Sequence, residues 1–292
     1  MFESCLICTD FSDGLHRLIH FVPNLAAGGL KQIIFCHSVP LWEEGEVPRI
    51  DREKMAEAEA KLSQALEEAP EGVEVKIEVV SGRPTETVPR LLEKYKIDVI
   101  MVGTPVRSLL TEKIFGSTTM GLAKLTSIPL LILRPQLIST YTVEELKLRS
   151  QHLWRYLLLP YNGTKLCNYA LERVKEFARS KSGNSFKQCL VLWTVEDTSR
   201  NRLIVEQRIE EAKEKLKSVK AELEELGLTV TTELRQGNFV NEILDAALNY
   251  DISAIVTATN YQSNLLNWVI PSDMEDLLRC SWFPVLLCSP KD

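Results

Sequence analysis

Short apolar runs alternate with longer amphipathic segments along the whole chain. Runs such as 99–102 and 130–133 are unbroken stretches of Val, Ile, Leu and Met. Between such runs, segments such as 51–68 carry apolar residues at the spacing of one helix face and charged residues elsewhere. Short apolar strands separated by helices are typical of a parallel sheet that helices cover on both faces. The pattern therefore predicts an α/β fold.

The same alternation runs through both halves of the chain. In the first half we expect strands at 5–9, 32–39, 73–80, 99–102 and 130–133, and helices at 13–25, 51–68, 85–95 and 116–124. In the second half we expect strands at 156–159, 189–195, 229–234, 254–257 and 285–288, and helices at 166–178, 204–226, 240–248 and 273–280. Each half is therefore expected to form an open parallel five-stranded sheet with helices on both faces.

The two halves align with each other as an internal repeat. From Gly82 onward GRPTETVPRLLEKYKIDVIMVGT lies over GNFVNEILDAALNYDISAIVTAT without a gap, at an offset of 155 residues. Tyr95 meets Tyr250 in this alignment. Earlier in each half, SCLICTDFSDG corresponds to YLLLPYNGTKL at a slightly different offset. A repeat of this length predicts two copies of one domain, at 1–136 and 153–292.

The segment between the copies, 137–152, is expected to be more than a loose tether. It contains neither Gly nor Pro. Thr142 is followed three residues later by Glu145, which is the capping-box spacing found at helix starts. We therefore expect a linker that contains a short helix.

Composition and charge narrow the class of partner. Of 292 residues, 45% are apolar and 25% are charged, and the net charge is −6. No block of five like charges occurs, so we expect neither nucleic acid nor a membrane surface as a main partner. No apolar run approaches the length of a membrane span, and the first residues lack the basic region of a signal peptide. We therefore expect a cytoplasmic protein.

Two spacings that suggest redox or metal chemistry favour structural roles instead. Cys5 and Cys8 form a C-x-x-C within a predicted strand, where residues three apart point to opposite faces. His16 and His20 have the spacing of one helix face, but no clearly placed carboxylate or thiol completes a metal site. The odd total of seven cysteines fits reduced thiols, and we expect no resident metal.

Ligand-binding residues are expected where the strands of such a sheet end. Ligands of open parallel sheets bind beyond the carboxyl ends of the strands, where the strand order reverses. In the first copy these places are 9–12, after the first strand, and 103–108, after the fourth. Further on, 116–118 reads Gly-Ser-Thr and opens a predicted helix, whose N-terminal N–H groups suit a phosphate. The same residues also suit an ordinary turn and N-cap, and that alternative stays open.

The residues at these places resemble a known family. An alternating domain with Asp10 and Ser12 after its first strand and a glycine closing its fourth is similar to the universal stress proteins. Nucleotide-binding members of that family carry a glycine, two residues, a second glycine, nine residues, and a third glycine followed by Ser or Thr. In the first copy Gly103, Val106 and Gly116 fall on the three glycine positions, so the spacing is intact and one glycine is replaced. The resemblance covers both copies and implies the adenine nucleotide α-hydrolase-like fold.

The resemblance implies an adenine nucleotide site in the first copy. Adenosine would lie beside the ends of the first and second strands, and ribose and phosphates beside the loop after the fourth. The implied residues are Thr9, Asp10, Ser12, Ser38, Val39, Gly103, Val106, Arg107, Gly116, Ser117 and Thr118. The ligand would be ATP, ADP or AMP, and Mg²⁺ can accompany it. Val106 argues against binding if its position needs a positive φ, because a β-branched residue is strained there, although its N–H can donate from an ordinary conformation.

The second copy departs from the family pattern at most of these positions. Its counterparts of Asp10, Gly103, Val106, Arg107 and Gly116 are Asn162, Ala258, Tyr261, Gln262 and Pro271, while Ser272 preserves Ser117. Because the glycines and the arginine are gone, we expect the second copy to be a structural partner without nucleotide.

The resulting expectation is a tandem universal stress protein, a stress-response regulator that binds an adenine nucleotide in its first copy. No nucleophile elbow, P-loop or evident catalytic base is present, so we expect no enzyme, and slow ATP hydrolysis at most. An adenylyl transferase has only the fold in its favour. The alternative is a scaffold of the same fold that binds no nucleotide and acts through protein–protein interaction. The resemblance also implies that the two copies pair with each other as an intramolecular dimer, and leaves a homodimer and an unknown protein partner open.

Overall fold

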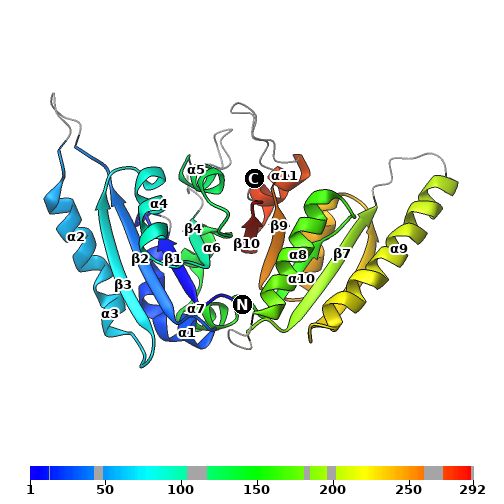
Figure 1. Ribbon diagram of the computed structural model, residues 1–292, viewed down its shortest axis with the longest axis horizontal. Coiled ribbons are helices and arrows are strands. Elements are labelled where there is room, and N and C mark those ends of the chain that lie inside the picture. The colour runs from blue at the N-terminus through cyan, green and yellow to red at the C-terminus, as the bar shows by residue number, and fades with distance from the viewer. Residues whose placement is uncertain are drawn as a thin grey trace. The chain divides into compact units, whose positions relative to one another are not determined.

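The computed structural model describes residues 1–12, 14–42, 49–103, 117–180, 185–195, 202–259 and 272–290. The chain divides into two compact units, Phe2–Gln151 and His152–Asp292, which are called here the first and the second unit. Each unit contains five strands and the helices that connect them (Figure 1).

The first unit is an open parallel sheet with the strand order β3-β2-β1-β4-β5. All its strand pairs are parallel. Its strands are β1 (Ser4–Cys8), β2 (Gln32–Val39), β3 (Glu74–Ser81), β4 (Val99–Gly103) and β5 (Leu130–Leu133). Its helices are η1 (Leu15–Phe21), α1 (Val22–Ala27), α2 (Arg52–Leu62), α3 (Gln64–Glu67), α4 (Pro84–Lys94), α5 (Ser117–Leu125), α6 (Pro135–Thr140) and α7 (Val143–Gln151). Helices lie on both faces of the sheet (Figure 1).

The second unit repeats this topology with the order β8-β7-β6-β9-β10, again with parallel pairs. Its strands are β6 (Tyr156–Pro160), β7 (Gln188–Val195), β8 (Thr229–Gln236), β9 (Ala254–Ala258) and β10 (Val285–Cys288). Its helices are α8 (Lys165–Arg179), α9 (Arg202–Glu224), α10 (Phe239–Asn249) and α11 (Ser272–Cys280). The predicted fold class, two open parallel five-stranded sheets with helices on both faces, is therefore confirmed.

Two predicted helices are divided in the structure. The segment 13–25 is not one α-helix: η1 is a 3₁₀ helix, and α1 begins only at Val22, with Pro23 in its first turn. Proline has no N–H to continue a helix but fits a first turn, which explains where α1 begins. The segment 51–68 is interrupted at Ser63, whose hydroxyl donates to the Ala60 carbonyl at 2.7 Å. Such a bond competes with the helical pattern and separates α2 from α3.

The predicted helix between the copies is α7, and its capping box is formed. Thr142 N donates to Glu145 Oε2 at 2.8 Å, and Glu145 N donates to Thr142 Oγ1 at 3.3 Å. The helix is packed against α1 of the same unit so closely that a Cβ at Gly28 would lie 3.0 Å from the Gln151 carbonyl oxygen. Helix α7 is therefore folded against the first unit.

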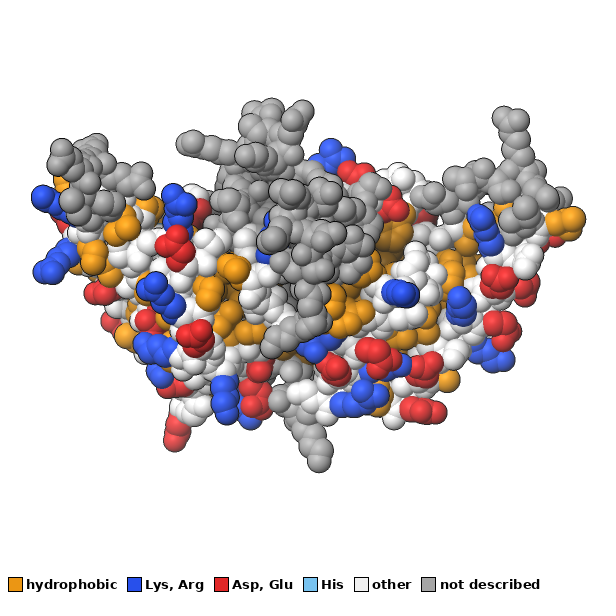
Figure 2. Space-filling view, turned by 45° about the horizontal axis from the view of Figure 1, so that its top comes forward, with side chains coloured by type: hydrophobic (Ala, Val, Ile, Leu, Met, Phe, Trp, Pro, Cys, Tyr) orange, Lys and Arg blue, Asp and Glu red, His pale blue; other side chains and the backbone are white. Residues whose placement is uncertain are grey.

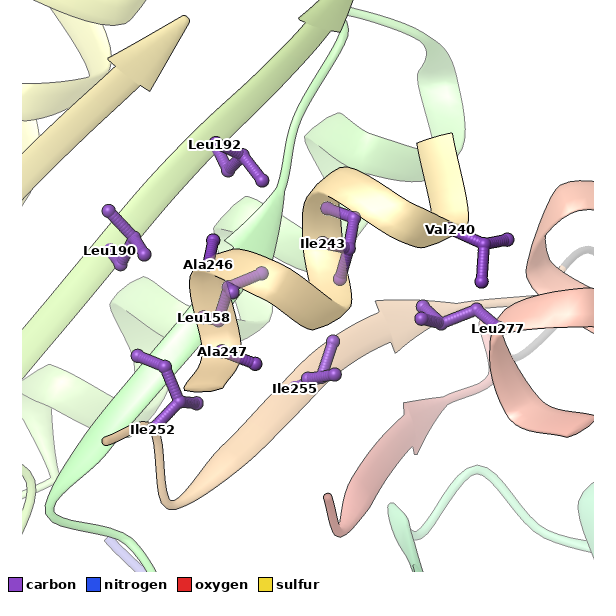
Figure 3. Close-up of a cluster of buried hydrophobic side chains, with 10 residues drawn as sticks. All are labelled: Leu158, Leu190, Leu192, Val240, Ile243, Ala246, Ala247, Ile252, Ile255 and Leu277. Carbon is purple, nitrogen blue, oxygen red and sulfur yellow. The ribbon is translucent and has the colours of Figure 1, made fainter. Parts of the chain in front are cut away.

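Buried aliphatic side chains between helix α10 and the sheet form one core of the second unit. Figure 3 shows Ile243 of α10 over Leu158 of β6 and Ile255 of β9, and all three have no exposed surface. Ala246 and Ala247, also fully buried, leave room for the helix to approach the strands. The period of this helix thus places its small and branched residues on the sheet and Leu248, which is 70% exposed, on the solvent side.

The buried cysteines of β1 and β7 do not supply a reactive thiolate. All seven cysteines are free, and Cys5 and Cys8 lie in β1 as predicted. Burial raises the pKa of the Cys5 thiol far above its ordinary value, and that of Cys189 to about 12, so neither is a thiolate at neutral pH.

Among the described helices, none combines the length and apolar character that crossing a bilayer requires.

An ion pair between α8 and α9 makes the stability of the second unit depend on pH. Lys175 is 10% exposed and donates to Glu172 Oε1 at 2.7 Å and to Glu222. The hydrogen bond from Lys175 lowers the pKa of Glu222 below its ordinary 4.5. Burial lowers the pKa of Lys175, but the bonds to Glu172 and Glu222 outweigh it and raise this pKa above 10.5.

Replacing Glu222 by glutamine is expected to flatten this pH dependence. In the native protein the depressed pKa of Glu222 stabilises the fold above pH 4.5, and this contribution is lost as pH falls through the folded pKa. The raised pKa of Lys175 stabilises below pH 10.5 and is lost as pH rises through its folded value. Melting temperatures measured from pH 3 to pH 11 test this, with Glu224→Gln on the same helix as control. Equal pH profiles for native protein and Glu222→Gln would contradict the assignment.

Candidate functional site

Predicted site residues that the structure describes at the ends of β1, β2 and β4 lie at one end of the first unit's sheet. Because β1 pairs in parallel with both β2 and β4, Cys8 lies opposite Cys36 and Val102. The segment 9–12 follows β1 directly, Ser38 and Val39 end β2, and Gly103 ends β4. The carboxyl ends of three neighbouring strands therefore bring these residues together, as the sequence predicts for a doubly wound sheet.

The turn after β1 is held by its own polar side chains. Asp10 Oδ1 accepts hydrogen bonds from Ser12 N and Ser12 Oγ, both at 2.8 Å. Thr9 is buried, its Oγ1 accepts from Phe11 N at 3.1 Å, and its N–H donates to the Cys36 carbonyl at 3.0 Å. The turn thus anchors Thr9 to β2 and presents the Asp10 carboxylate on the surface.

Phe11 is a site residue that the sequence reasoning missed. Its φ is +64°, a left-handed conformation that strains a residue with a side chain by about 1–2 kcal/mol. Its ring centroid lies 4.5 Å from that of His37, and His37 Nδ1 lies 2.8 Å from the Thr9 carbonyl oxygen. The Lys61 ammonium lies 5.2 Å from the centre of the Phe11 ring. The internal repeat gives a sequence signal for a positive φ at Phe11, because the aligned residue of the second copy is a glycine, Gly163, whose φ is +74°.

The end of β2 is connected to helix α4 and to the turn before it. Ser38 Oγ lies 2.9 Å from Thr87 Oγ1, and the Val39 carbonyl accepts from Gly82 N at 2.8 Å. Gly82 has φ +124°, a conformation that side-chain-bearing residues rarely adopt. Val39 is buried and Ser38 is half-buried. Both residues are therefore in position to line a ligand at the strand ends, although the Ser38 hydroxyl already has a partner.

Part of the predicted phosphate loop lies outside the described residues. Val106, Arg107 and Gly116 fall in the segment 104–116, which the structure does not describe. Helix α5 begins at Ser117, so Ser117 and Thr118 form its first turn. The backbone of these two residues is thus at a helix N-terminus, where N–H groups lack helical partners.

The second unit keeps the turn after its first strand and changes what surrounds it. Asn162 Oδ1 accepts from Thr164 N at 3.1 Å, as Asp10 accepts from Ser12. Tyr161 donates to Asn168 Oδ1 at 2.7 Å and lies edge-on to Trp193, with ring centroids 5.7 Å apart. Of the remaining counterparts, Ala258 ends β9 and Ser272 begins α11, while Tyr261, Gln262 and Pro271 fall outside the described residues. The second unit therefore has the amide of Asn162 where the first has the carboxylate of Asp10, and its neighbouring rings are Tyr161 and Trp193 instead of Phe11 and His37.

Of the two histidines of the predicted 13–25 helix, His16 lies next to the turn after β1. The His16 ring lies 5.9 Å from Phe11, and its Nδ1 is buried without a hydrogen-bond partner. Burial lowers the pKa of His16, and the charges of Arg17 and Lys61 lower it further. His20 is exposed. Across the described ranges, His, Cys, Asp and Glu form no group of three that is placed to hold a metal ion.

Comparison with known proteins agrees with this geometry. The universal stress protein family model matches residues 1–134 and again 154–289. The chain is similar in structure to a universal stress protein from Archaeoglobus fulgidus DSM 4304, at 18% identity and a TM-score of 0.66, with 98% of each chain covered. It is also similar to a functionally unknown protein from Pseudomonas aeruginosa PAO1, at 15% identity and a TM-score of 0.63, with 99% of this chain and 93% of that chain covered. Sequence identities this low show similarity of fold only. No curated protein matches the chain. Because the family model matches both copies, the chain is a tandem member of the universal stress protein family.

Proposed function

We propose that this tandem universal stress protein binds one adenine nucleotide, in the first unit, and hydrolyses it slowly or not at all. Occupancy would change the affinity for a partner protein. The observation that carries the proposal is the difference between the two copies: the first keeps Asp10, Gly103 and Gly116, and the second has Asn162, Ala258 and Pro271 at these positions.

The described geometry supports binding rather than chemistry at this site. The strand ends offer the exposed Asp10 carboxylate to the hydroxyl or amino donors of a nucleoside. The first turn of α5 offers backbone N–H groups, which suit phosphate oxygens. Backbone amides hold a phosphate without activating a water molecule, so slow turnover is the expected consequence. Arg107 and Mg²⁺ belong to the proposal as further groups that would neutralise phosphate charge.

A second candidate function is a scaffold that binds no nucleotide, and contacts of Phe11 favour it. The Thr9 carbonyl is already within hydrogen-bond distance of His37 Nδ1, and the Phe11 ring packs against His37. A base entering at the end of β1 would have to displace one of these rings. If the protein is a scaffold, the contacts of His37 with Thr9 and Phe11 are a permanent part of the fold.

Titration calorimetry with ATP, ADP and AMP up to 5 mM tests the two candidates. We expect one nucleotide per chain, and Asp10→Ala to weaken binding by about tenfold, the effect of losing one charge-assisted hydrogen bond. The matched control is Asn162→Ala, which alters the same turn in the second unit and is expected to leave the affinity unchanged.

Mass spectrometry of small molecules released from the native protein provides an independent readout. Absence of binding at 5 mM together with no released nucleotide would exclude nucleotide binding and leave the scaffold function. Equal losses in Asp10→Ala and Asn162→Ala would show that the first unit is not the site.

A further inference from the structure

A pocket of about 560 Å³ opens at the outer edge of the first unit's sheet. It lies between α2 and α4, with the end of the edge strand β3 between them. Helix α2 contributes Arg52, Met55 and Glu59, which recur at the spacing of one helix face, and α4 contributes Arg90 and Leu91. The volume falls in the range of small-molecule sites. Figure 2 shows hydrophobic side chains interspersed with Lys and Arg on the surface of this unit.

In the second unit an ion-pair network of Arg235 lies at the corresponding place. The bounds of β3 and β8, and those of α4 and α10, differ by the same 155 residues, which puts Arg235 of β8 over Val80 and Asp245 of α10 over Arg90. Arg235 Nη1 lies 2.7 Å from Asp245 Oδ2, and its Nε lies 2.6 Å from Glu233 Oε2. It also donates to the Glu242 carbonyl at 3.3 Å. One strand guanidinium thus joins β8 to α10, and its charge is matched within the unit.

In the first unit neither of the two aligned positions carries an acidic residue. The strand residue is Val80, which has no charge, and the helix residue is Arg90, a guanidinium where the second unit has a carboxylate. Among the described residues, neither Arg90 nor Arg52 has an ion pair or hydrogen bond through its guanidinium. Glu59 is the lining's single carboxylate against these two arginines. The lining therefore has a net charge of +1.

The rest of the lining is largely apolar. Apolar walls from Met55, Val80 and Leu91 adjoin Ile50, whose side chain is 57% exposed. An occupant that satisfies the lining has an anionic group for Arg90 and an apolar body for the aliphatic walls.

We propose that this pocket binds a small amphipathic organic acid, with its carboxylate on Arg90 and Arg52 and its hydrocarbon chain against Met55, Val80 and Leu91. The ligand carboxylate takes the role that Asp245 plays for Arg235 in the second unit. None of the lining residues is among those implied for the nucleotide, although the Thr87 hydroxyl oxygen of the lining lies 2.9 Å from that of Ser38. Decanoate and ATP affinities are therefore measured separately, so that failure of one proposal can be told from failure of the other.

Calorimetry on the full chain with sodium decanoate up to 5 mM tests the proposal, with 1-decanol as the uncharged probe of equal length. We expect one decanoate per chain, at least tenfold weaker binding of decanol, and at least tenfold weaker binding of decanoate to Arg90→Ala, because each removes the charge-assisted bonds. Arg83→Ala, which removes an exposed arginine outside the lining, is the matched control and is expected to bind as the native protein does.

The double substitution Val80→Arg with Arg90→Asp closes the pocket in the manner of the second unit. It is expected to abolish decanoate binding while preserving the circular dichroism spectrum and the affinity for ATP. No decanoate binding by the native protein, equal binding of decanol and decanoate, or binding to Arg90→Ala within twofold of the native protein would each overturn the proposal.

Discussion

Replacing Ile243 by alanine is expected to lower the free energy of unfolding by about 3 kcal/mol, within the range of 2–5 kcal/mol typical of buried aliphatic truncations. Ile243 has no exposed surface and lies in the cluster that joins α10 to β6, β7 and β9 (Figure 3). Its neighbours on the same helix face, Ala246 and Ala247, cannot move to fill the space because they are short and already packed. The substitution therefore loses both transfer free energy and packing contacts.

Urea denaturation of the full chain, followed by far-ultraviolet circular dichroism, measures this effect. The matched control is Leu248→Ala on the same helix, where the side chain is 70% exposed and a change below about 0.5 kcal/mol is expected. Similar losses in the two variants would mean that α10 does not present Ile243 to the sheet as described.

Replacing Arg235 by alanine is expected to lower the free energy of unfolding by about 2 kcal/mol. The Arg235 side chain is 18% exposed and pairs with Glu233, Glu242 and Asp245, of which the first two are themselves less than a third exposed. Its removal leaves those carboxylates close together without a cation. Breaking a fully buried pair costs more, about 3–5 kcal/mol, and partial exposure reduces the effect through solvent screening.

The control for Arg235 is Arg279→Ala. Arg279 is 57% exposed and pairs with Asp276 one helical turn away, so we expect a loss of at most about 0.5 kcal/mol. Melting curves at low and at high salt separate the two cases further, because screening by salt affects an exposed pair more than a partly buried network. An Arg235→Ala loss no larger than that of Arg279→Ala would contradict the role assigned to this network.

Much of the fold could be predicted because its signals are local and repeated. Strands such as 99–102 are recognisable from four consecutive apolar residues, and the capping box of Thr142 and Glu145 is visible as a spacing. The break at Ser63 was missed, since whether a serine hydroxyl bonds the preceding turn depends on how the helix packs. The 3₁₀ geometry of η1 was missed for a similar reason, because 3₁₀ and α-helices share most of their side-chain pattern.

Less of the candidate site could be predicted. Asp10 and Ser12 were placed at the end of β1 by family pattern, and their mutual hydrogen bonds fit the turn expected there. The contact of Phe11 with His37 joins the turn after β1 to strand β2 and depends on a positive φ that no local preference of phenylalanine favours. The pocket between α2 and α4 likewise combines two separate stretches of the sequence, 50–59 and 80–91.

The sequence by itself determined that this chain is a tandem repeat of an α/β domain with one better-preserved site, because periodicity, repeat register and glycine spacing are properties of residue order. Only the tertiary structure decided which side chains satisfy one another. Arg235 is neutralised by carboxylates from β8 and α10, whereas Arg90, the first-unit counterpart of Asp245, has no carboxylate partner among the described residues. Whether a charge is matched depends on distances of a few ångströms across packed elements, and residue order does not specify those distances.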